Sequence, residues 1–170
     1  MTITETTTGE RPDLLQTLTT HRRFLLVTVQ GLSDEQAAQR TTASELCLGG
    51  LIKHVAEVES TWVDFILRGA SAMAGPDGAT DWKSRFQMAP GETLAELVGH
   101  YEQVAQRTDA LVATLPDLDA AHPLPDAPWF EPGARWSARR VLLHIIAETA
   151  QHAGHADIIR ESLDGAKSMG

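Results

Sequence analysis

The 170-residue chain has a single cysteine, Cys47, few aromatic residues and fewer basic than acidic side chains. One cysteine excludes an internal disulfide and a cysteine-rich zinc module, and it fits a reducing cytoplasm. The formal net charge of -9 argues against a nucleic-acid partner and against binding to an anionic membrane surface. No apolar run approaches the roughly 20 residues of a membrane span, and the N-terminus lacks the features of a signal peptide. We therefore expect a cytoplasmic protein.

The alternating pattern of β-strands is also absent, whereas apolar residues recur at helical spacing. Ser33 and Gln36 have the spacing of a capping box, which predicts a short helix after Ser33. Four long helices are expected over about Pro12–Gln30, from after Thr42 to Arg68, over about Glu92–Leu115, and from after Ser137 to about Leu163. Together they predict an all-α fold, a four-helix bundle, which we expect to be antiparallel with crossover connections.

Two connections, 69–91 and 116–136, are longer than is usual in a compact domain, and such loops tend to be functional. They carry Trp82 and Trp129, which we take as candidates for the wall of a binding pocket. No repeat or second domain is visible. Residues 1–11 are expected to form a disordered tail, and residues 12–170 a single helical domain.

The last predicted helix contains a stripe of polar side chains. At about 100° per residue, all of them fall within an arc of less than a quarter-turn, and aliphatic residues lie on or beside the same arc. We therefore expect the stripe to face the interior of the bundle, at least in part. Its members are His144, Glu148, His152 and His155.

The second long helix adds His54, which lies on an otherwise apolar face. Alone, such a histidine is usually a hydrogen-bonded core residue. Facing a second polar cluster, it predicts a divalent metal, because unpaired buried polar groups are costly. Imidazole and carboxylate ligands suit Zn²⁺, with Ni²⁺, Fe²⁺ or Mn²⁺ as alternatives. From spacing alone, several different sets of three ligands are possible. It is also consistent with the spacing that the polar residues only hydrogen-bond to one another and bind no metal.

At these residues the chain resembles the DinB-like superfamily of metal-binding four-helix bundles. The similarity is to the actinobacterial branch that includes mycothiol-dependent S-transferases and the N-terminal domain of mycothiol-dependent maleylpyruvate isomerase. It rests on GLSDEQAAQR, on LGGLIKHVAEVESTW with its KHxxxVExxW pattern, and on WSARRVLLHIIAETAQHAGHADIIRE with its ExxxHAGHADxxRE pattern.

The resemblance implies a particular ligand set. In the maleylpyruvate isomerase branch one histidine of the second long helix and an ExxxH pair hold zinc, which here gives His54, Glu148 and His152. Other members use HxxxH followed by Arg-Gly-Gln. Because His155 stands where those have glutamine, we expect it to neighbour the ligands or face the substrate, with His144 lining the same pocket.

The resemblance also implies an activity. It implies that a thiol, mycothiol, is activated by the metal and attacks a small electrophile, as in detoxification. Trp82, Trp129 and Arg139 are the candidates for binding the thiol cofactor. Two alternatives stand beside this interpretation: a hydrolase that uses a metal-bound water, and a non-enzymatic metal-binding or structural bundle. A homodimer is a further expectation.

Overall fold

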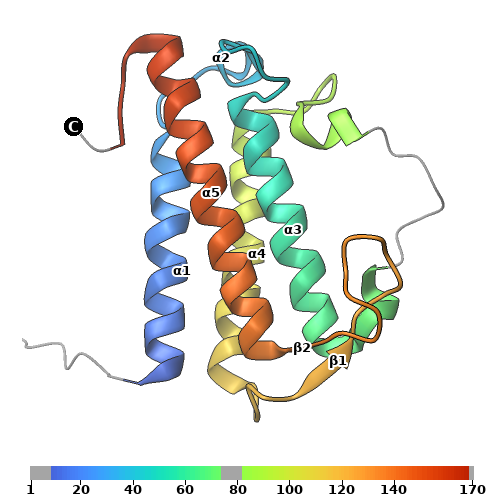
Figure 1. The fold of residues 1–170 in the computed structure, drawn as a ribbon. Coiled ribbons are helices and arrows are strands. Elements are labelled where there is room, and N and C mark those ends of the chain that lie inside the picture. The colour runs from blue at the N-terminus through green and yellow to red at the C-terminus, as the bar shows by residue number, and fades with distance from the viewer. Residues whose placement is uncertain (1–8, 74–81, 169–170) are drawn as a thin grey trace, which may run out of the picture.

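The computed structural model describes residues 9–73 and 82–168 and is built around four long helices (Figure 1). Helix α5 packs against α1 and α3, and α3 packs against α4 and α5, so the helices form a ring closed by α1 and α4. The elements are α1 (Glu10–Val27), α2 (Asp34–Ala38), α3 (Leu48–Arg68), η1 (Gly69–Met73), η2 (Trp82–Phe86), α4 (Leu94–Thr114), β1 (Ala121–Pro123), β2 (Arg135–Ser137) and α5 (Ala138–Asp164).

The all-α bundle is confirmed, but its helices do not simply alternate in direction. Helices α1 and α5 run one way, and α3 and α4 run the other (Figure 1). The end of α3 and the start of α4 therefore lie at opposite ends of the bundle. Strands β1 and β2, the small exception to the helical prediction, form an antiparallel pair just before α5.

Local signals explain most helix ends. The Ser33–Gln36 capping box forms as predicted, and Thr93 and Glu96 make another at the start of α4. Ser137 caps α5 by accepting a hydrogen bond from the Arg140 amide, and Gly165 ends that helix at φ 81°.

The predicted start of the second long helix, after Thr42, is wrong. The Thr42 hydroxyl bonds the Ser44 hydroxyl at 2.8 Å, and α3 begins only at Leu48. Such short-range side-chain hydrogen bonds compete with helix formation and hold this segment in a bent, irregular conformation. At the other end of the chain, α1 begins at Glu10 and not at Pro12, and residues 1–8 of the expected tail lie outside the described residues.

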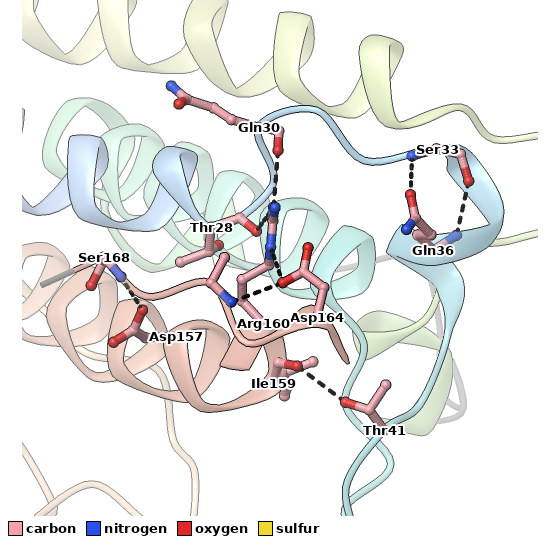
Figure 2. A network of polar contacts seen from close by, with 11 residues as sticks. Thr28, Gln30, Ser33, Gln36, Thr41, Asp157, Ile159, Arg160, Asp164 and Ser168 are labelled. Carbon is pink, nitrogen blue, oxygen red and sulfur yellow. Dashed lines mark hydrogen bonds and ion pairs between the residues drawn. The ribbon is translucent and has the colours of Figure 1, made fainter. Parts of the chain in front are cut away.

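The C-terminal half of α5 is tied to the connection between α1 and α2 (Figure 2). The Arg160 guanidinium donates to the carbonyl oxygens of Thr28 at 3.0 Å and Gln30 at 2.9 Å, and to the Asp164 carboxylate at 2.9 Å. Thr41 donates to the Ile159 carbonyl at 3.1 Å. The Arg160 contacts hold α5 against the end of α1, and the Thr41 contact holds it against the segment that follows α2. Among the described helices, none combines the length and apolar character that crossing a bilayer requires.

A polar layer divides the apolar core into two clusters, one toward each end of the bundle. Along each long helix, one buried polar residue lies between the residues that belong to one apolar cluster and those that belong to the other. These polar residues are Arg22, Glu59, Thr108 and Thr149. Glu59 is fully buried and receives two hydrogen bonds from the Arg22 guanidinium, at 2.5 and 3.3 Å. Asp109 accepts a third from Arg22 at 2.7 Å. The ion pair joins α1, α3 and α4 at mid-height.

Candidate metal centre

Three predicted ligands from two helices come together in the structure. Helix α5 carries Glu148 and His152 one turn apart, and α3 brings His54 opposite them. One potential ligand atom from each residue lies within 4.8 Å of the other two, and the Glu148 Oε2–His152 Nε2 distance is 3.6 Å. Ligand atoms around a tetrahedral zinc ion lie about 3.3 Å apart, given bonds of about 2.0 Å. This donor trio (His54, Glu148 and His152) is therefore somewhat wider than a bound zinc ion requires, and its donor set could hold a metal ion.

The electrostatics of the donor trio suit a cation. Burial, assisted by the neighbouring His152, lowers the pKa of His54 to about 4, so its ring is neutral at neutral pH. A hydrogen bond with His152 lowers the pKa of Glu148, against the opposing effect of burial. A neutral imidazole and an ionised carboxylate are the protonation states in which these groups bind metals.

Two further histidines contact the donor trio without belonging to it. His155 Nδ1 lies 3.4 Å from His152 Nδ1, which leaves Nε2 of His152 directed toward Glu148. His144 Nε2 lies 3.9 Å from Glu148 Oε1, and burial lowers the pKa of His144. The side chain of His144 is held edge-on against the rings of Trp62 and Trp136.

The His54 ring is covered by Phe86, which the sequence did not indicate as a site residue. Their ring centroids are 4.1 Å apart. Phe86 belongs to η2, which rests directly on the first turn of α3, where the thiol of Cys47 donates to the Phe86 carbonyl oxygen at 3.6 Å. A Cβ atom on Gly50 would lie 1.9 Å from that oxygen. Glycine at position 50 therefore allows η2 to reach its place over His54.

We expect Gly50→Ala to lower the free energy of unfolding by about 1–3 kcal/mol, because the new methyl group must displace backbone. Gly49→Ala is the matched control. Its Cβ would meet the end of the flexible Met88 side chain, at 2.3 Å from the sulfur, so a smaller loss is expected. Urea denaturation of both variants measures the difference. Equal stabilities for the two variants would contradict this role of Gly50.

The donor trio opens into a pocket of about 720 Å³. His54 and Glu148 line it, as do the predicted residues His144 and Trp129. An ion held by the donor trio could therefore be reached by a small molecule in the pocket. The other lining residues are Glu57, Val58, Ser60, Thr61, Trp62, Met73, Arg85, His100, Pro125 and Phe130.

Sequence comparison decides the family. A model of the mycothiol-S-transferases matches residues 13–165. The chain belongs to this family. The match spans all of α3, α4 and α5 and most of α1, and it includes the whole donor trio. The resemblance found in the sequence is thereby confirmed, and the family description supports a mycothiol-related S-transferase.

Structural comparison agrees on the fold. A crystal structure described as a conserved protein from Enterococcus faecalis superimposes with a TM-score of 0.71, covering 94% of this chain and 100% of that one. The sequences are 13% identical, so this likeness concerns the fold alone. No curated protein matches the sequence.

The three residues predicted to bind the thiol cofactor are not brought together in the described part of the structure. Trp129 lines the pocket beside the donor trio. Arg139 does not: it forms ion pairs with Glu10 and Asp119 and lies in a different surface depression, near the start of α1. The side chain of Trp82 lies outside the described residues, although its backbone begins η2.

We expect the metal-free protein to lose stability as the pH falls from about 6.5 to 4. An unfolded histidine titrates near 6.5, whereas the pKa of folded His54 is about 4, so the unfolded chain binds more protons between these values. The contribution of His54 between pH 7 and pH 5 is about 2 kcal/mol. Urea denaturation at several pH values, with a chelator present, gives the dependence of the free energy of unfolding on pH. This dependence should be weaker in His54→Gln than in wild type, whereas the exposed control His100→Gln should keep it. If His54→Gln keeps the wild-type pH dependence, the predicted role of His54 is refuted.

Proposed function

We propose that the chain is a divalent-metal-dependent thiol S-transferase that joins mycothiol to a small electrophile. The observation that carries this proposal is the donor trio at the edge of an open pocket, in a chain of the mycothiol-S-transferase family. Three protein ligands leave a coordination position free, as is typical of catalytic metal sites.

In this proposal His54, Glu148 and His152 hold the ion, for which zinc is the first candidate and nickel or another divalent metal the alternative. When bound, such a metal lowers the pKa of a thiol ligand, which is then present as thiolate near neutral pH. The contact between the Nδ1 atoms of His155 and His152 would orient the His152 ring, so that Nε2 is the atom available to the metal. His144 lies beside the second carboxylate oxygen of Glu148, at 3.9 Å, and lines the same pocket.

The pocket brings the two reactants together. The thiol sulfur forms a bond to carbon, the leaving group departs with the electrons of its own bond, and the thiol proton passes to solvent. The chain's one cysteine is a poor candidate for a covalent intermediate, since Cys47 is buried beneath η2 and donates to a backbone carbonyl. The nucleophile in this proposal is therefore the cofactor thiol.

The proposal implies a cytoplasmic role in detoxifying electrophiles, in a compartment that keeps thiols reduced. The expected homodimer stays a prediction, and sedimentation of the purified chain would test it.

The test is product analysis with protein purified without a histidine tag. Protein, zinc, mycothiol and 1-chloro-2,4-dinitrobenzene should give the dinitrophenyl thioether and chloride, at a rate well above that without protein. A chelator should abolish the increase and added zinc restore it. An increase that persists in chelator would contradict metal dependence. Absence of a thioether would contradict the transferase, and faster hydrolysis of the electrophile without thiol would instead favour the hydrolase.

A further inference from the structure

Aromatic side chains cover one side of the pocket. Trp62 comes from α3, and Trp129 and Phe130 come from the loop between β1 and β2; these three form the aromatic wall. Trp136 of β2 lies behind it, stacked on Trp62 with ring centroids 4.8 Å apart and planes inclined by 16°. Phe130 meets Trp62 edge-on at 6.4 Å and lies 6.1 Å from Trp129. The wall is thus built from rings that support one another.

The remaining lining is mostly polar, and His54 marks the division on α3. From His54 at zero, Val58 and Trp62 lie at about 40° and 80°, whereas Thr61 and Glu57 lie at about 340° and 300°. Arg85 adds a positive charge to the lining, and His100 adds hydrogen-bonding capacity. On α3, His54 therefore stands between an apolar half of the pocket lining and a polar half.

Trp129 is the most exposed large apolar side chain in the described part of the chain. Its exposed fraction is 76%, and the other exposed ones, Leu67, Leu143 and Ile158, do not line the pocket. Phe130, next in sequence, is half-buried against Trp62 and Trp136. An exposed indole beside a built aromatic cluster is an unfilled contact surface for an apolar ring.

We propose that the aromatic wall binds an electrophile carrying a flat apolar ring system, and that Trp129 selects this electrophile and does not bind the thiol cofactor, the role that the sequence had suggested for it. The inference rests on the proposed function, because a transfer between two molecules needs two subsites that adjoin the donor trio. The apolar half offers stacking and little hydrogen bonding, which suits the electrophile. The polar half suits a water-soluble thiol cofactor.

The kinetic test compares two electrophiles with the same thiol. With 1-chloro-2,4-dinitrobenzene the sulfur–carbon bond replaces carbon–chlorine and chloride leaves with the electron pair; with iodoacetamide, iodide does so. Trp129→Ala should lower the ratio of kcat/KM for the aromatic over the aliphatic electrophile about tenfold, since stacking and lost contact area act on the aromatic alone. Trp129→Phe should restore most of the ratio. Leu143→Ala, another exposed apolar side chain, is the control. An unchanged ratio in Trp129→Ala would overturn the assignment.

A binding test separates this inference from the proposed function. 1,3-Dinitrobenzene has no leaving group, so it reports binding without thiol or turnover. We expect it to shift the indole N–H signals of Trp129 and Trp62 in ¹⁵N NMR spectra and to bind Trp129→Ala about tenfold more weakly. Binding with no conjugation in the product assay would refute the transferase and leave the aromatic subsite standing. If conjugation is observed but dinitrobenzene does not shift the Trp129 signal, the aromatic subsite is refuted and the transferase is not.

Discussion

Glu59→Leu should lower the free energy of unfolding by about 3–5 kcal/mol, because it leaves the Arg22 guanidinium in the core without its main partner. Glu59 is 0% exposed and Arg22 is 5% exposed, so water cannot replace the lost contacts. Asp109 lies on the partly exposed edge of the network and still accepts one hydrogen bond, from Nη1 of Arg22. The other two donors of Arg22, Nε and Nη2, lose their partner with Glu59. Urea denaturation of the variant at pH 7 measures the loss.

The matched control for this prediction is the double variant Arg22→Met/Glu59→Leu. Replacing both members of a buried ion pair with apolar groups of similar volume is often neutral or stabilising, so most of the lost stability should return. A single variant that costs less than about 1 kcal/mol, or a double variant as unstable as the single one, would contradict the pairing of Arg22 with Glu59.

His54→Ala should weaken the binding of zinc by more than about 100-fold. Removing a residue that hydrogen-bonds to a metal ligand typically lowers the metal affinity about 10–100-fold, and removing a ligand itself should lower it more. The catalytic efficiency with mycothiol should fall in parallel. Competition with a chelating dye measures the affinity, and circular dichroism checks that the variant is folded. Glu148→Gln, which keeps the shape of the side chain, should also bind zinc more weakly.

His100→Ala is the matched control, since this histidine lines the same pocket but lies outside the donor trio. Its zinc affinity should stay within a factor of two or three of wild type. If His54→Ala and His100→Ala bind zinc equally well, His54 is not a ligand.

The sequence predicted what depends on helical periodicity. The four long helices, the cap at Ser33 and the shared face of Glu148 and His152 all follow from residues three or four apart. Side chains on such regular elements keep their spacing in the fold, so the approach of His54 to this face could be expected once both helices were taken to face inward.

What the sequence could not give depends on contacts between distant segments. Phe86 covers His54 because η2 rests on Gly50, and no local pattern around Phe86 indicates this. The pairing of Arg22 with Glu59 was missed for a similar reason: charged residues on helices usually face water, and only the packing of α1 against its neighbours buries both. Crossover connections were predicted, but no local pattern indicated that α4 runs in the same direction as α3.

We propose that His54, Glu148 and His152 hold one divalent metal ion. The most direct measurement is anomalous diffraction at the zinc edge, on crystals of tag-free protein supplied with one equivalent of zinc. We predict a single strong peak in each chain, within bonding distance of one atom from each of the three residues, at about 2.0–2.2 Å. A peak bound by His144 or His155 in place of His54, or no peak between α3 and α5, would contradict the account.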